Sequence, residues 1–166
     1  FQTPRVFREM SAEDNVRFGL QFAGRVRRHP HDAFDDARSI LGFLGLAEMA
    51  AAPAGGLTPA RQRLLEIGMA LGARPRLLLL DEVAAGLTEA EVEAAARLIR
   101  RVRDELGVAV VWIEHAVRAL MRHVGRVVVL HQGRKIADGL PAEVANDAAV
   151  LEAYLGDQTG STRAAA

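Results

Sequence analysis

The sequence Leu77-Leu78-Leu79-Leu80-Asp81-Glu82 decides the predicted fold of this chain. Its leucines are too few to cross a membrane and do not alternate with polar residues, so they fit a parallel strand buried on both faces in mid-sheet. The carboxyl ends of such strands border the ligand crevice of a doubly wound sheet. Two carboxylates there could hold Mg²⁺ and polarise a water for phosphoryl transfer, although a strand ending in solvated acids fits the same residues.

A second apolar run, Val108-Ala109-Val110-Val111-Trp112-Ile113, predicts another buried parallel strand and is followed at once by Glu114-His115. Between the two runs, Thr88-Glu89-Ala90-Glu91 has the pattern of a capping box and opens a long helix that should end at Gly107. The resulting βαβ unit has both strands ending at the same edge of the sheet. Three titratable side chains should meet there: Asp81, Glu82 and His115.

Three helices should precede the first strand and form an α-helical subdomain beside the α/β core. The first should cover residues 12–23, and the second should cover residues 32–44 and end at Gly45. The third should begin at Thr58-Pro59, with the threonine as N-cap and the proline in the first turn. The basic stretch at residues 25–31 fits a solvated loop, or a nucleic-acid patch that lacks interleaved aromatic residues.

The C-terminal part of the chain predicts a hairpin flanked by helices. The dipeptide Gln132-Gly133 between two short apolar runs is typical of a hairpin turn. Residues from Gly156 onward have the composition of a disordered tail. The expected elements are a helix over residues 116–124, strands over 126–130 and 134–137, and helices over 141–144 and 148–155.

The composition favours one globular domain without a strong net electrostatic potential at its surface. The chain has 166 residues, of which 21 are Lys or Arg and 21 are Asp or Glu, so no global charge attracts nucleic acid or anionic lipid. It contains no cysteine, which excludes disulfides and thiolate metal sites. No apolar run approaches the roughly 20 residues of a membrane span. The chain begins with Phe1 in what looks like the middle of a motif, so we expect a fragment.

Taken in order, these stretches resemble the ATP-binding subunits of ABC transporters, and among them the branched-chain amino-acid import type. The resemblance runs from Phe1 to about Gly156 and rests on order and spacing. It implies an α/β fold, with a partial P-loop NTPase core of the RecA-like kind, parallel strands with flanking helices, and an α-helical subdomain. The stretches that carry it are Leu77 to Glu82, Gly86-Leu87, Ile113-Glu114-His115, Pro141 to Val144 and Glu152 to Gly156.

By this resemblance the cofactors are ATP and Mg²⁺, with Asp81 and Gln2 as the expected metal-binding residues. Glu82 would be the catalytic carboxylate that polarises the attacking water, and His115 would contact the γ-phosphate. Such roles suit phosphoryl transfer, which needs mainly positioned charge. Without the resemblance, His115 also fits a capping or core histidine.

The signature motif of that family has its counterpart at Thr58-Pro59-Ala60, where the chain departs from the usual residues. The motif would bind the ATP held by an opposite subunit through a hydroxyl, glycine amides and a helix N-terminus. Thr58 keeps the hydroxyl, whereas Pro59 has no N–H and Ala60 has a Cβ where glycine is usual. We therefore expect a weakened or asymmetric trans site rather than a lost one. Val83 and Thr88 also replace a usual proline and a usual acid, which bears on the coupling of the dimer.

No G-x-x-x-x-G-K-[ST] sequence occurs, so the loop that would cradle the phosphates is missing. The expectation is N-terminal truncation upstream of Gln2, a chain that hydrolyses nothing alone, and a sheet with an exposed edge.

The implied function is that of an ABC-type ATPase, the energy-coupling subunit of an importer for branched-chain amino acids or related small polar solutes. Its partners would be permease subunits, a second ATP-binding subunit and, indirectly, a substrate-binding protein, at the cytoplasmic face of the membrane and without nucleic acid. The alternatives are a soluble ABC-type ATPase of DNA repair or translation and a non-catalytic interaction module.

The chain is expected to divide into three parts. Residues 1–75 would form the loop of Gln2 and the helical subdomain with its signature helix, residues 76–140 the C-terminal part of the ATPase core, and residues 141–166 the terminal helices and a tail.

Overall fold

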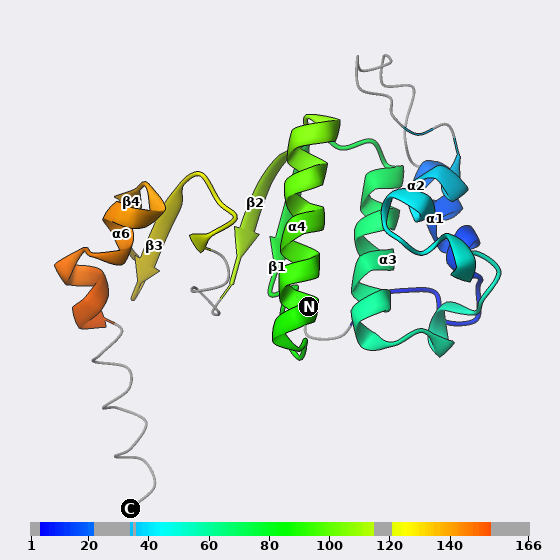
Figure 1. Cartoon of the computed structure of the whole chain (residues 1–166), viewed down its shortest axis with the longest axis horizontal. Helices are drawn as coiled ribbons and strands as arrows, with labels where there is room; N and C mark the ends of the chain where they lie inside the picture. The colour runs from blue at the N-terminus through cyan, green and yellow to red at the C-terminus, as the bar shows by residue number, and fades with distance from the viewer. Residues whose placement is uncertain (1–3, 22–33, 35, 115–120, 154–166) are drawn as a thin grey trace, which may run out of the picture. The chain divides into compact units, whose positions relative to one another are not determined.

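Strands β1 (Leu77–Asp81) and β2 (Ala109–Ile113) pair in parallel and are joined by helix α4 (Glu89–Leu106), which confirms the predicted βαβ unit. The computed structural model describes residues 4–21, 34, 36–114 and 121–153 (Figure 1). It separates into two compact units, Phe1–Ala116 and Val117–Ala166. The βαβ unit lies in the first of them, so the site expected at its edge belongs to that unit.

The burial of β1 differs from the prediction. Leu78 and Leu80 are buried, but Leu77 and Leu79 are 49% and 68% exposed. The expectation of a strand buried on both faces in mid-sheet is therefore wrong for the described residues, in which β1 pairs with β2 alone. One face packs into a core that includes residues of α4, and the other face is bare. The bare face continues onto β2, through Val111 and Ile113.

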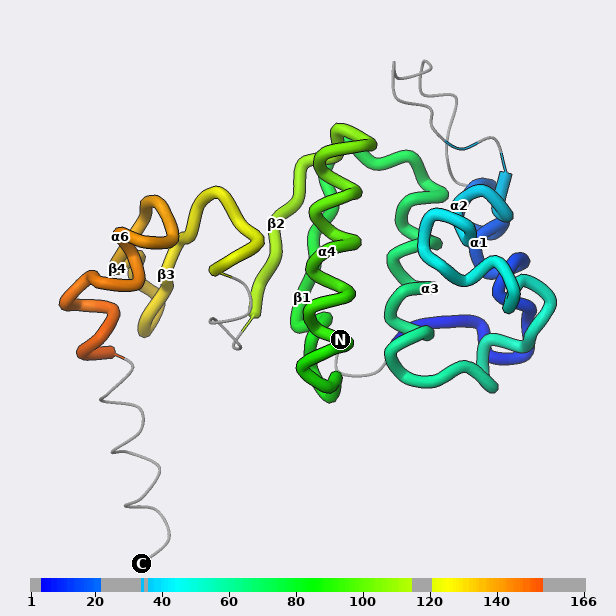
Figure 2. The backbone as a smooth tube through the Cα atoms, in the orientation of Figure 1, coloured from blue at the N-terminus to red at the C-terminus, as the bar shows by residue number. Residues whose placement is uncertain are grey.

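Three helices precede β1, as expected, and two short 3-10 turns join the second to the third (Figure 2). The second helix begins at Ala37 rather than near residue 32, because Asp36 accepts the Ser39 N–H at 2.7 Å and forms a capping box. Gly45 ends it with a φ of +72°, as predicted. The elements are α1 (Ala12–Gln21), α2 (Ala37–Phe43), η1 (Ala47–Met49), η2 (Ala54–Gly56) and α3 (Pro59–Gly72).

Helices α1 and α3 approach each other closely because small residues lie where they meet. A Cβ built on Gly19 would collide with the backbone carbonyl of Met69. Gly72 is similarly confined, since its Cβ would lie 3.0 Å from the Leu20 nitrogen. The contact gives the helical part of the first unit a dense core around Val16, Ile40, Leu41 and Leu65.

The second unit contains the predicted hairpin and terminal helices. Strands β3 (Val127–His131) and β4 (Arg134–Gly139) are antiparallel, and Gln132 and Gly133 turn between them with φ values of +48° and +75°. Positive φ at both central residues is the pattern of a type I′ turn. Helix α6 (Pro141–Ala145) and helical residues 148–153 follow.

The helix expected over residues 116–124 lies mostly outside the described residues. Met121 is helical, but Arg122 and His123 form a turn, so the helix ends earlier than expected. The predicted disordered tail also lies outside the described residues.

Candidate functional site

The carboxyl ends of β1 and β2 meet at one edge, where the sequence predicted a site. Asp81 lies beside Ile113 in the parallel register. The strand ends at Asp81, because Glu82 adopts a left-handed conformation with φ +49°; the Glu82 N–H makes the last bond to β2, to the Ile113 carbonyl at 3.0 Å. Asp81 is exposed and Glu82 is half-buried, so the two carboxyl groups have different solvent access. This geometry presents two adjacent acids at the end of a paired strand.

The loop after Glu82 is fixed to the end of β2 by a carboxylate. The Oε1 atom of Glu114 accepts the Ala84 N–H at 2.7 Å and the Trp112 Nε1–H at 3.0 Å. Ala84 is 8% exposed, so this bond satisfies a buried amide. Sequence reasoning gave Glu114 no role. Its position at the end of the second strand, directly before His115, was the signal that it shares this edge.

The N-terminus of α3 holds the residues expected in the signature motif. Thr58 is the N-cap, and its Oγ1 accepts the Arg61 N–H at 3.4 Å, with Pro59 in the first turn as predicted. The buried Gln62 anchors this helix start, because its Nε2 donates to the Ala54 and Leu57 carbonyls at 3.0 and 3.1 Å. The helix N-terminus is therefore held by a buried side chain while Thr58 itself is exposed.

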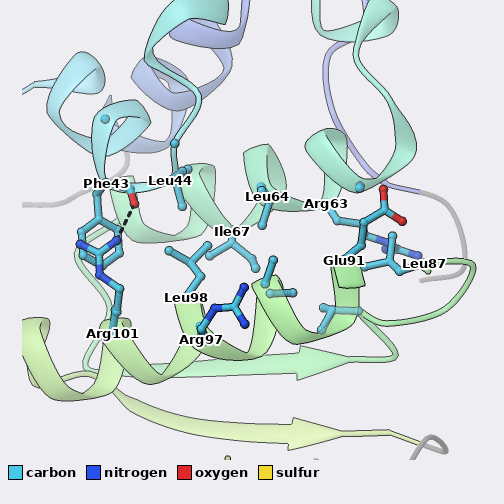
Figure 3. A pocket seen from close by; sticks show the side chains of 16 residues that line it. Phe43, Leu44, Arg63, Leu64, Ile67, Leu87, Glu91, Arg97, Leu98 and Arg101 are labelled. Atoms are coloured by element: carbon cyan, nitrogen blue, oxygen red, sulfur yellow. Dashed lines mark hydrogen bonds between the residues drawn. The ribbon is translucent and has the colours of Figure 1, made fainter. Parts of the chain in front are cut away.

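A groove of about 430 Å³ runs between α3 and α4 (Figure 3). Ala60 lines it from the start of α3, and Val83 and Leu87 line it from the loop after Glu82. The signature-motif helix and this loop are thus parts of one surface. Arginines lie along the wall, and Arg101 covers the Phe43 ring at 4.3 Å from the ring centre. Asp81 and Glu82 are not among the residues that line the groove.

Two of the predicted site residues, Gln2 and His115, lie outside the described residues. Within the described ranges no group of three or more His, Cys, Asp or Glu side chains is arranged to hold a metal ion. Asp81 and Glu82 still suit Mg²⁺ chemically, because this ion binds through one or two carboxylates together with water and substrate phosphates. No described helix is both long enough and apolar enough to pass through a bilayer.

Comparison with known proteins relates the chain to one family. Residues 134–159 match the family model described as "Branched-chain amino acid ATP-binding cassette transporter". The chain is 36% identical to the high-affinity branched-chain amino acid transport ATP-binding protein BraF of Pseudomonas aeruginosa and 35% identical to the corresponding protein LivG of Escherichia coli. Both alignments cover 95% of this chain, which spans 66% of the length of these relatives, just under two thirds.

A solved structure of an ABC transporter component also resembles this chain. The chain superposes on cbiO1 of Clostridium perfringens, which is part of the ABC transporter complex cbiONQ, with a TM-score of 0.74 and 26% identity. The superposition covers 89% of this chain and 58% of that one.

Proposed function

Because this chain belongs to the ATP-binding subunits of ABC transporters, of the branched-chain amino-acid type, we propose that it forms part of an ATP-hydrolysing subunit that powers solute import. The observation that carries the proposal is the pair Asp81-Glu82, which ends a strand whose neighbour β2 ends at the same edge. The likeness to solved ABC ATPases confirms the predicted fold class, an α/β P-loop NTPase core with an α-helical subdomain.

The two acids would divide the work of hydrolysis. Asp81, which is exposed at the end of β1, would hold Mg²⁺, and the ion would neutralise charge on the ATP phosphates. Glu82 would orient and polarise the attacking water, a role that suits a half-buried carboxylate beside the end of β2. Gln2 is proposed as a second contact of the metal or water, and His115 as a donor to the γ-phosphate. The assignments of Asp81 and Glu82 rest on the sequence pattern together with the shared strand edge, and those of Gln2 and His115 rest on the resemblance to the family.

The start of α3 would contact the ATP that is held by a second ATP-binding subunit. Thr58 offers a hydroxyl, and the helix N-terminus beside it favours an anion. Pro59 cannot donate a backbone hydrogen bond, so this contact to a partner's ATP would be weaker than a contact through glycine amides. We therefore favour a heterodimer, in which the partner subunit supplies the stronger half of the interface.

The remaining partners follow from the transport role. Permease subunits would receive the movement of the helical part, residues 1–75, and the chain would lie at the cytoplasmic face of the membrane through them. A substrate-binding protein would deliver branched-chain amino acids or related small polar solutes. The support is the naming of the relatives as branched-chain amino acid transport proteins and the family model at residues 134–159.

ATP turnover of the complete gene product, assembled with its partner subunits, tests the proposal. Glu82→Gln should lower kcat by about 100-fold or more, because positioned acid–base groups contribute that much. ATP binding, measured by equilibrium dialysis, should stay near the level of the unaltered protein.

The matched control is Glu89→Gln, which removes the same charge from an exposed position in the first turn of α4. This variant should keep its turnover. Turnover in Glu82→Gln equal to that of the control would overturn the catalytic assignment of Glu82.

A further inference from the structure

The loop that follows Glu82 is shaped by hydrogen bonds of its own and is joined by others to the end of β2. Inside the loop, the Ala85 N–H donates to the Glu82 carbonyl at 3.2 Å and the Leu87 N–H donates to the Ala84 carbonyl at 3.1 Å. These bonds shape the turn but do not attach it to the sheet. Val83 packs into the core, and two hydrogen bonds reach from the loop to the end of β2. One joins the Glu82 N–H to the Ile113 carbonyl, and the other joins the Ala84 N–H to Glu114.

The two attachments lie on either side of the side chain of Glu82. The first is a backbone bond and does not depend on the identity of any side chain. The second depends entirely on the carboxylate of Glu114, whose Oε1 accepts at 2.7 Å from a buried amide. A bond to an ionised acceptor is stronger than one to a neutral acceptor. Glu114 is therefore the side chain that fixes the backbone two residues beyond Glu82.

Trp112 holds Glu114 in this position. Its indole Nε1–H donates to the same Oε1 atom at 3.0 Å, and both side chains are half-buried. This bond favours the orientation of the carboxylate that reaches Ala84. Trp112 is the single tryptophan of the chain, so its indole N–H gives one separate resonance that reports this contact.

We propose that Glu114 is a positioning residue, which sets the orientation of Glu82 by tying the Ala84 amide to the end of β2. The link to hydrolysis rests on the proposed function, whereas the contact itself can be tested without any activity. Loss of the tie should leave the ATP-binding groups in place but let the water-orienting carboxylate move. The expected signature is a fall in kcat with little change in KM.

The first experiment uses the full 166-residue chain and records ¹H–¹⁵N spectra and amide exchange. Glu114→Ala should speed exchange at Ala84 by about tenfold, since one hydrogen bond to a charged group is lost. It should also move the Trp112 indole resonance upfield. Glu114→Gln keeps a neutral acceptor and should give intermediate values. Glu48→Ala, which removes an exposed carboxylate from η1, is the matched control and should change neither.

The second experiment measures ATP turnover of the same variants in the complete gene product with its partners. Glu114→Ala should lower kcat about tenfold, Glu114→Gln should recover part of the loss, and Glu48→Ala should match the unaltered protein. Unchanged Ala84 exchange in a folded Glu114→Ala chain overturns the tie. Faster exchange with an unchanged kcat overturns the positioning of Glu82. If the unaltered protein does not hydrolyse ATP, the proposed function fails and the link to hydrolysis fails with it, while the exchange data still decide the tie.

Discussion

The side-chain carbonyl of Asn15 accepts the backbone N–H of Phe7 at 2.8 Å, and its amide nitrogen donates back to the Phe7 carbonyl at 3.0 Å. Asn15 is fully buried and also donates to the Ser11 carbonyl at 2.9 Å. One side chain thus satisfies the backbone of an irregular segment that has no ladder partner at this point. The N-terminal segment is attached to α1 by this side chain.

Asn15→Leu should lower the free energy of unfolding by about 1–3 kcal/mol, because the part-buried Phe7 N–H loses its acceptor and the Phe7 and Ser11 carbonyls each lose a donor. Urea denaturation followed by circular dichroism measures the change. Asn146→Ala is the control, since Asn146 is exposed and caps only the Ala142 carbonyl. An equal loss in both variants would contradict the special role of Asn15.

Gly19→Ala should destabilise the first unit by about 1–3 kcal/mol, because the added Cβ meets the Met69 backbone, which can move only if α1 and α3 separate. Gly42→Ala is the matched substitution in α2, where a Cβ has open space. It should raise stability by up to about 1 kcal/mol through helix propensity. Thermal unfolding of the two variants should therefore shift in opposite directions, and shifts of the same sign would refute the close helix contact.

The hairpin of the second unit should lose stability in acid. The hydrogen bond from Arg126 at 2.7 Å, assisted by Lys135 at 2.8 Å, holds the pKa of Asp138 well below its usual 3.8. A carboxyl whose pKa is lower in the folded state stabilises that state above its unfolded pKa, and this contribution disappears as the pH falls below about 3.8.

Carbon-13 titration of the Asp138 carboxyl should place its midpoint below that of an exposed aspartate. Asp138→Asn should remove the part of the free energy of unfolding that changes between about pH 5 and pH 2, the range in which aspartates titrate. A midpoint at the ordinary value would show that the ion pairs do not persist in solution.

The bare face of the β1–β2 sheet should bind apolar dyes. Leu79 and Val111 lie side by side in the register and are 68% and 50% exposed. Replacing both with threonine should reduce the fluorescence of bound anilinonaphthalene sulfonate and reduce self-association in sedimentation velocity. Leu140→Thr, at an exposed apolar residue of the second unit, should have a smaller effect. Equal effects would indicate that the sheet face is not the main apolar surface.

Sequence patterns predicted the elements well because their signals are local. Alternation, helical spacing and the turn residues Gln132-Gly133 require only neighbouring residues. Burial was harder, since a run of leucines reads the same whether one or both faces of the strand are covered, and Leu79 is exposed. The start of α2 was placed too early because several aspartates could cap it, and the reciprocal bond with Ser39 selects Asp36.

The shared edge of Asp81 and Glu82 with the end of β2 was predictable, because parallel strands joined by a helix end on the same side. The bond from Ala84 to Glu114 was not. It joins residues 30 positions apart and depends on the direction of one side chain, which no periodicity encodes.

The parallel pairing of β1 with β2 also bears on when this region forms during folding. All of α4 lies between Asp81 and Ile113, so their contact is non-local and joins the two ends of the whole crossover. Contacts of this kind form slowly compared with helices and hairpins. The acidic edge therefore forms later than the local hydrogen bonds of α4, and a chain arrested before that step would have this helix in place without an ordered Glu82.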